Sequence, residues 1–233
     1  MELALFVPIV VLQRVVADFC TMYFVKTPAI LPFLFPNVVH RIPNIYNKIF
    51  LTFDDGPTPE ITEFTLDTLN KFNAKASFFC VGKNVVEHPT IFKKLMANGH
   101  TIANHTFDHL NGLKTNTNVY LNNIFEARKH IPSDLFRPPY GQIKFSQFRS
   151  LKKDYKIVMF DILAGDFDQK LQPEKCLHNL LKYAKVGSII VLHDSVKAAK
   201  TLQYVLPRFL KYCQEQNWVC APLDPDIYNF KKK

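Results

Sequence analysis

Two adjacent carboxylates and a pair of histidines are the residues of this chain best suited to chemistry. Asp54 and Asp55 end an apolar run, and His105 and His109 follow about fifty residues later in a His-x3-His spacing. One carboxylate and two imidazoles form the usual donor set of a catalytic metal that keeps a position open. The second carboxylate is then free to act as a base on water. The pattern predicts a metal-assisted hydrolase.

Each half of this pattern is weak when it stands alone. Asp-Asp-Gly-Pro is commonly a turn or a cap, and the histidine spacing serves one ion only in a helix or a tight loop. Both motifs lie at the ends of strand-like runs, so together they favour a metal site more strongly than either does alone. The remaining histidines lack partners at ligand spacing and are interpreted as structural or exposed: His40, His88, His100, His130 and His178.

Three further residues could supply what ester or amide hydrolysis still needs. Arg137, before two prolines, is a permanent cation that can hold a carboxylate ionised and oriented. His193 ends a buried apolar run and can act as a general acid. Asp166 is the natural carboxylate to orient that imidazole and raise its pKa. Each residue also has a simpler interpretation when it is taken alone. Arg137 could be a surface arginine, His193 a core histidine, and Asp166 part of a solvated acidic loop.

The elements that must position these residues alternate along the chain. From residue 48 onward, short apolar runs alternate with amphipathic stretches, as is typical of βα units around a parallel sheet. Thr58-Pro59-Glu60 and Pro173-Glu174 indicate helix starts. The expected strands are 48–54, 76–81, 101–104, 135–137, 156–162, 188–193 and 218–222. We predict an α/β fold, a distorted, incomplete (β/α)7-type barrel in a single domain, with a doubly wound sheet as the alternative.

The chemically suited residues share one position relative to these strands. All fall at or just beyond a carboxyl end, which is where barrels build active sites. One catalytic cleft would explain the whole set: Asp54, Asp55, His105, Arg137, Asp166, His193 and Asp194.

The flanking segments are expected to differ from the central domain. We place an N-terminal extension or arm at 1–46, the catalytic domain at 47–222 and a basic tail at 223–233. The prolines of residues 22–47 indicate an extended arm that packs on the barrel through residues 31–36. The apolar run 4–12 is too short to span a bilayer and lacks the flanks of a cleaved signal peptide. A peripheral membrane-touching segment or a true start at Met22 would explain it, and the compartment stays open between cytoplasm and envelope.

The composition predicts one large core, with 48% hydrophobic and 21% charged residues. The net charge of +9 would favour anionic envelopes, membranes or nucleic acid. However, the charges are dispersed, which favours a solvated basic surface, and no nucleic-acid-binding motif is present. Five cysteines without a CxxC pair indicate neither a disulfide framework nor a thiolate metal site. The sequence does not indicate an oligomeric state.

The order of the motifs closely resembles that of the NodB-like polysaccharide deacetylases, carbohydrate esterase family four. The motifs are TFDDG at 52–56, HTFDH at 105–109, RPPYG at 137–141, a spaced aspartate-aromatic pair at 166–167 and LHD at 192–194. The resemblance covers about residues 47–222. It implies one divalent metal ion, with zinc first and cobalt, nickel or manganese as alternatives. The implied substrate is an acetylated carbohydrate, such as chitin- or peptidoglycan-like N-acetylglucosamine oligomers.

The resemblance also implies a role for each motif residue. Asp54 would be the general base, tethered by Arg137, and the Tyr140 backbone N–H would help stabilise the oxyanion. His193 would be the general acid, tuned by Asp166. Phe167 stands where the family usually has tryptophan and lacks the indole N–H donor. The metal ligands would be Asp55, His105 and His109, and the substrate pocket would be lined by Leu192, Phe167 and Pro139.

Three other functions stay open. An O-acetyl esterase of the xylan type would need the same machinery. Amidohydrolases that open cyclic amides share the fold but generally lack the metal triad, so the intact histidine-aspartate set argues against them. A non-catalytic sugar-binding relative would be expected to have lost a catalytic residue, and none of the expected ones is missing.

Overall fold

The computed structural model describes residues 23–28, 30–43 and 45–224 of the chain. Its strands are β1 (Val38–Val39), β2 (Lys48–Asp54), β3 (Ser77–Cys80), β4 (Thr101–Asn104), β5 (Leu135–Phe136), β6 (Lys156–Val158), β7 (Ile162–Leu163), β8 (Ile189–His193) and β9 (Val219–Cys220). Its helices are α2 (Ile30–Leu34), α3 (Ile61–Lys71), α4 (Gly82–Glu87), α5 (Pro89–Ala97), α6 (Thr117–Arg128), the 3-10 turn η1 (Pro139–Gly141), α7 (Phe145–Leu151), α8 (Pro173–Tyr183) and α9 (Ala199–Glu215).

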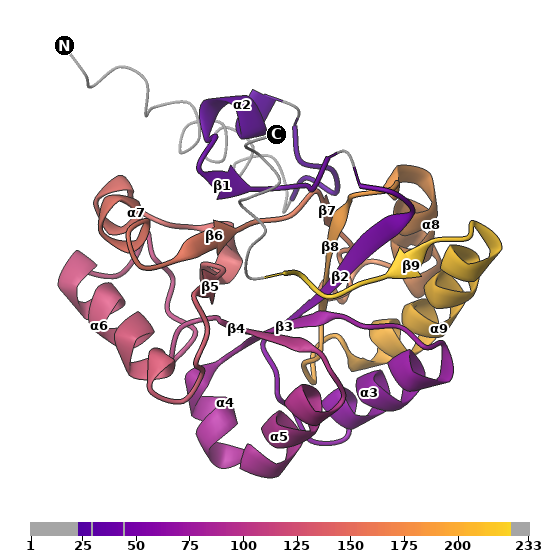
Figure 1. Cartoon of the computed structure of the whole chain (residues 1–233), viewed down its shortest axis with the longest axis horizontal. Coiled ribbons are helices and arrows are strands. Elements are labelled where there is room, and N and C mark those ends of the chain that lie inside the picture. The colour runs from indigo at the N-terminus through magenta and orange to yellow at the C-terminus, as the bar shows by residue number, and fades with distance from the viewer. Residues whose placement is uncertain (1–22, 29, 44, 225–233) are drawn as a thin grey trace.

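The strands form one parallel sheet that curls into an open half-barrel with helices around its outer face (Figure 1). The strand order is β1-β6-β5-β4-β3-β2-β8-β7, and β9 pairs with β2 beside this path. This single α/β domain confirms the predicted distorted, incomplete barrel. A doubly wound sheet would carry helices on both faces, so that alternative is wrong.

The alternation of side chains along β2 determines which of its residues face the inside of the barrel. Ile49, Leu51 and Phe53 of β2 pack with the outer helices in the largest hydrophobic cluster. Because successive side chains of a strand point to opposite faces, Thr52 and Asp54 lie on the inner face. Inner positions therefore carry polar residues towards the carboxyl end of the strand, where the predicted site lies.

Most predicted strands are found, but the expected strand 156–162 is wrong. β2 and β4 have the predicted bounds, and β3, β5, β8 and β9 are shorter than predicted. Residues 156–162 instead supply β6, which pairs with β5, and the start of β7, which pairs with β8. The chain crosses from one side of the open barrel to the other between them, at Met159–Asp161, where the buried Asp161 side chain accepts from Lys26 and Ser188.

The N-terminal arm is less extended than predicted. Residues 30–34 form the short helix α2, in which Phe33 is 79% exposed, so Phe33 does not serve in the expected anchor through residues 31–36. Phe35 does pack against a core cluster that contains the buried Val38. Val38–Val39 form β1, which pairs with β6. The sheet therefore begins before the expected domain boundary at residue 46.

The arm also bonds to the other free edge of the sheet. The backbone N–H of Thr27 donates to the Asp161 carbonyl, and that of Leu163 donates to the Val25 carbonyl, each at 2.9 Å. Lys26 forms an antiparallel bridge with Ile162. The arm, indigo in Figure 1, thus lies between β6 and β7 and contacts both.

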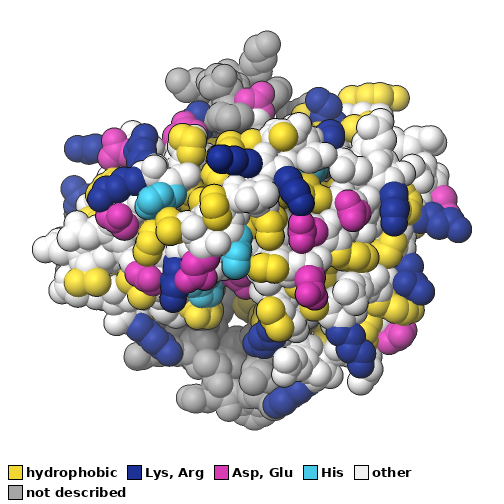
Figure 2. Space-filling view, turned by 90° about the horizontal axis from the view of Figure 1, so that it is seen from below, with side chains coloured by type: hydrophobic (Ala, Val, Ile, Leu, Met, Phe, Trp, Pro, Cys, Tyr) yellow, Lys and Arg dark blue, Asp and Glu magenta, His cyan; other side chains and the backbone are white. Residues whose placement is uncertain are grey.

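The surface and the cysteines of the described residues agree with the predictions from composition. Figure 2 shows one face of the molecule, on which basic and acidic side chains are interspersed with apolar ones. Cys80, Cys176, Cys213 and Cys220 are free and buried. No helix within the described ranges has the length and apolar character to cross a bilayer. The apolar run 4–12, Cys20 and the terminal lysines lie outside those ranges.

Candidate metal and catalytic site

The predicted metal ligands lie together at the carboxyl ends of β2 and β4. One donor atom each from Asp55, His105 and His109 falls within 4.8 Å of the others. Asp55 Oδ1 is 3.1 Å from His109 Nε2 and 3.8 Å from His105 Nε2. The structure therefore brings together the three residues that the sequence singled out.

A tight loop, rather than a helix, brings the two histidines to one point. Thr106 and His109 both have positive φ, of 67° and 57°. The Asn104 side chain accepts from the backbone N–H of Thr106, and the Asn123 side chain accepts from those of Phe107 and Asp108. These side-chain bonds satisfy the backbone of a turn that cannot satisfy itself. His105 and His109 consequently face the same carboxylate.

The chemistry of this group fits a divalent cation. His105 Nδ1 lies 2.8 Å from the carbonyl oxygen of Arg137. A carbonyl only accepts, so Nδ1 carries the proton and Nε2 offers its lone pair towards Asp55. Burial lowers the pKa of His105 to about 4, which keeps the ring neutral at neutral pH. Burial opposes ionisation of Asp55, but the hydrogen bond with His109 and the charge of His193 outweigh it, and its pKa is lowered.

Asp54 is fixed by a buried ion pair with Arg137. Arg137 Nη1 donates to Asp54 Oδ1 at 2.6 Å, and the two side chains are 1% and 7% exposed. The guanidinium also donates to Thr52 Oγ1 and to two backbone carbonyls, and it lies over the Phe79 ring. Arg137 is therefore a buried cation that fixes Asp54, and the surface-arginine interpretation is wrong.

His193 and Asp166 form a second pair at the same end of the sheet. Asp166 Oδ1 lies 2.9 Å from His193 Nδ1, and Asp166 Oδ2 accepts from the His193 backbone N–H at 2.7 Å. Burial disfavours the charged imidazole, but the charge of Asp166 and its hydrogen bond outweigh this effect and raise the pKa of His193 to about 9. His193 is therefore protonated at neutral pH, with Nε2 left to donate a proton.

Tyr140 lies beside His109 of the metal-binding group. Its φ of 61° marks a left-handed residue inside η1, and its ring lies 4.8 Å from the His109 ring centroid. The preceding Pro139 is buried. Tyr140 itself is 62% exposed, so this residue borders the open side of the site.

Leu192, one of the three residues expected to line the substrate pocket, lies on the other face of the sheet. It is fully buried and packs with Phe53 in the cluster between the sheet and the outer helices. Alternation along β8 puts Leu192 on the face opposite His193. Phe167, by contrast, lies beside His193, with ring centroids 5.1 Å apart.

Asp194 is the main site residue to which the sequence assigned no role. It is fully buried; its carboxylate accepts from the Gly56 backbone N–H at 3.1 Å and from Thr62 Oγ1 at 2.5 Å. A Cβ on Gly56 would collide with this carboxylate. Asp194 thus fixes the turn that carries Asp55. Its position directly after His193 in the sequence could have indicated that it belongs to the site.

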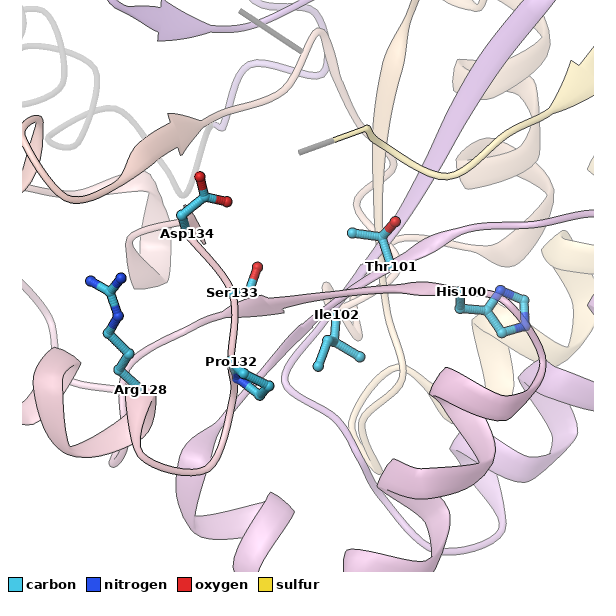
Figure 3. A pocket seen from close by; sticks show the side chains of 7 residues that line it. All are labelled: His100, Thr101, Ile102, Arg128, Pro132, Ser133 and Asp134. Atoms are coloured by element: carbon cyan, nitrogen blue, oxygen red, sulfur yellow. The ribbon is translucent and has the colours of Figure 1, made fainter. Parts of the chain in front are cut away.

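A pocket in the described part of the chain lies away from the candidate site. It is formed at the amino end of β4 and by the loop before β5 (Figure 3), with lining residues His100, Thr101, Ile102, Arg128, Pro132, Ser133 and Asp134. None of the predicted site residues lines it. The catalytic candidates belong to the opposite ends of the same strands.

The fold and the site together define a metal-dependent hydrolase on an open α/β barrel. Comparison with known proteins narrows this class: the family model described as polysaccharide deacetylase matches residues 43–158. A peptidoglycan-N-acetylglucosamine deacetylase of Bacillus cereus is 31% identical over 188 residues, which cover 78% of this chain and 88% of that protein. The chain belongs to the polysaccharide deacetylase family, carbohydrate esterase family four.

Two further comparisons support this assignment. The peptidoglycan-N-acetylglucosamine deacetylase PgdA of Listeria monocytogenes is 30% identical over 191 residues, and the match spans 79% of this chain but only 39% of that longer protein. A crystal structure of a peptidoglycan N-acetylglucosamine deacetylase superposes with a TM-score of 0.78 at 27% identity, covering 86% of this chain and 96% of that one. The likeness extends over most of the described structure.

Proposed function

We propose that the protein removes acetyl groups from N-acetylglucosamine residues of a peptidoglycan- or chitin-like glycan and releases acetate. The observation that carries the proposal is the division of labour between neighbouring carboxylates. Asp55 joins two histidines, while Arg137 holds Asp54 outside that group. The Bacillus cereus and Listeria relatives are peptidoglycan-N-acetylglucosamine deacetylases, which supports the choice of substrate class.

Asp55, His105 and His109 would hold one divalent cation, for which zinc is our first candidate. Two imidazoles and one carboxylate suit zinc and leave a coordination position open, although cobalt, nickel and manganese accept similar donors. When bound, the cation supplies Lewis acidity that polarises the acetyl carbonyl and lowers the pKa of water.

The remaining residues would move protons and stabilise charge. Asp54, oriented by Arg137, takes a proton from the attacking water as the water oxygen bonds to the acetyl carbon. The Tyr140 backbone N–H donates to the oxyanion that forms. His193 then gives its Nε2 proton to the sugar nitrogen, and the C–N bond breaks. Acetate and a free amino sugar are the products.

Phe167 would form one wall of the pocket beside His193, with Pro139 supporting the turn that carries Tyr140. Leu192 has no place in this pocket, since it packs on the other face of the sheet. For the domain organisation, we retain 47–222 as the catalytic unit and 223–233 as the tail. The arm, expected over 1–46, completes the sheet through β1.

The proposal is tested by acetate release from N-acetylglucosamine oligomers, peptidoglycan fragments and acetylated xylan. Metal-stripped protein is assayed before and after zinc or cobalt is restored. Metal-dependent release from the N-acetylated glycans is the expected result. Release from xylan alone would replace the proposal with an O-acetyl esterase. Stoichiometric metal binding without release from any substrate would favour a non-catalytic sugar-binding protein.

A further inference from the structure

The arm reaches the catalytic end of the barrel through its pairing with β7. The antiparallel register sets Thr27 opposite Asp161, Lys26 opposite Ile162 and Val25 opposite Leu163. Continued by two residues, the same register brings Tyr23 level with Gly165, just beyond the carboxyl end of β7. Strand pairing therefore positions Tyr23 of the arm beside the loop that contains Asp166.

Tyr23 fills the space beneath that loop. Gly165 has a φ of 85°, and a Cβ at this position would collide with the Tyr23 hydroxyl. The Tyr23 ring lies 5.0 Å from the Phe167 ring centroid, tilted by 52°. Burial, together with the negative charge of Asp168, raises the pKa of the phenol, so it stays neutral. The side chain is thus partly buried between a glycine and a phenylalanine of one loop.

Phe167 connects Tyr23 to the proposed proton donor. Its ring meets the His193 imidazole edge to face, with centroids 5.1 Å apart and an interplanar angle of 72°. Asp166 fixes Nδ1 and the backbone of His193, whereas Phe167 bounds the imidazole on another side. Such tilted aromatic contacts stabilise one relative orientation of the rings. Removing Tyr23 would leave space into which Phe167 can turn away from His193.

We infer that Tyr23 is a positioning residue of the active site, which holds Phe167 against His193 and makes the N-terminal arm a working part of the catalytic centre. The inference rests on the proposed function, in which His193 donates a proton. Tyr23 acts through Phe167 and has no assigned contact with substrate. Its loss should therefore affect kcat more than KM.

A double-mutant cycle in the full-length protein tests the contacts from Tyr23 through Phe167 to His193. Tyr23→Ala should lower kcat by about fivefold or more, with a change in KM below about twofold. Tyr23→Phe keeps the ring and should retain most of kcat. In a Phe167→Ala background, Tyr23→Ala should cause no further loss. An equal loss in both backgrounds, or none in either, would overturn the inference.

Tyr46→Ala is the matched control, because Tyr46 is an aromatic residue of the same arm that is 88% exposed. It should leave kcat unchanged, and a loss equal to that of Tyr23→Ala would count against a specific role. Thermal unfolding and metal content are measured for every variant. If Tyr23→Ala does not fold, Tyr23→Leu replaces it, since leucine fills the space without a ring.

Failure of the proposed function can be told apart from failure of this inference. If the wild type releases no acetate, the proposed function fails, and the contact is judged by NMR of labelled histidine instead. The His193 ring signals should then shift in Tyr23→Ala and stay in place in Tyr46→Ala. Unchanged His193 signals in Tyr23→Ala would refute the positioning role without reference to catalysis.

Discussion

Asp166 accepts both the side-chain and the backbone N–H of His193, one with each carboxylate oxygen. This double contact fixes the imidazole tautomer and the end of β8 together. It also explains how a histidine that is only 14% exposed at its side chain keeps a raised pKa. Asp166 makes the largest contribution to the raised pKa of the proposed proton donor, ahead of Asp55 and Asp54, and it can be replaced.

Replacing Asp166 by asparagine should move the alkaline limb of kcat to lower pH. The acid must be protonated to act, and His193 has its pKa raised to about 9 chiefly through Asp166 once burial is overcome. Without that charge the proton is lost at lower pH. The pH profiles of wild type and variant are measured with the same metal bound. Asp134→Asn, an equal charge loss next to Lys156, should leave the limb in place. An unmoved limb in Asp166→Asn would remove Asp166 from the tuning role.

Asp54→Asn and Asp55→Asn should give different defects although the residues are neighbours. Asp54→Asn should keep its metal and lose turnover by a factor on the order of 10² or more, because only the base is lost. Asp55→Asn should lose metal affinity, because a ligand charge is lost. Metal content by atomic spectroscopy and acetate release distinguish the two. A fully active Asp54→Asn would show that the base lies elsewhere.

His105→Ala should bind less metal than the wild type. The His105 ring is oriented by the Arg137 carbonyl and has no other assigned role. His100→Ala is a suitable control, since His100 is also a buried histidine but lies outside the group of donors. Equilibrium dialysis against zinc measures both variants. Unchanged zinc stoichiometry in His105→Ala would exclude His105 from the ligand set.

His100 should make the fold less stable as the pH falls from about 6.5 to about 4. Burial lowers its pKa to about 4, whereas the unfolded chain binds that proton near pH 6.5. Between these values the unfolded state holds more protons, so acid favours unfolding, and the stability is fully present above pH 6.5. Urea unfolding of wild type and His100→Gln at pH 7 and pH 4.5 measures the difference. The wild type should lose more stability than the variant, and equal losses would contradict the assignment.

The sequence predicted the group formed by Asp55, His105 and His109 because its motifs are local. Adjacent aspartates and a His-x3-His loop need only short-range geometry to present their side chains, and the bounds of β2 and β4 were predicted from the sequence. Leu192 failed for a reason specific to parallel sheets. Their strands are buried on both faces and lack an alternating pattern, so the sequence does not reveal which side a leucine faces.

Other features depend on contacts between distant parts of the chain. The run 156–162 is apolar except for Lys156 and Asp161, and pairing with β5 and β8 divides it into two strands. Tyr23 precedes Phe167 by more than a hundred residues, and no local spacing connects them. The buried Asp194 was visible in the motif, but its hydrogen bonds to Gly56 and Thr62 required the folded arrangement.

The contacts of the arm with both β6 and β7 bear on how the protein can be dissected. A fragment of residues 47–222 would contain every proposed catalytic residue, yet it would leave two sheet edges with unpaired backbone groups. Such edges are templates for association with other chains. We therefore expect that fragment to aggregate rather than to behave as a minimal enzyme. The arm would then keep the barrel soluble by covering both edges, although the motifs that define the family all lie outside it.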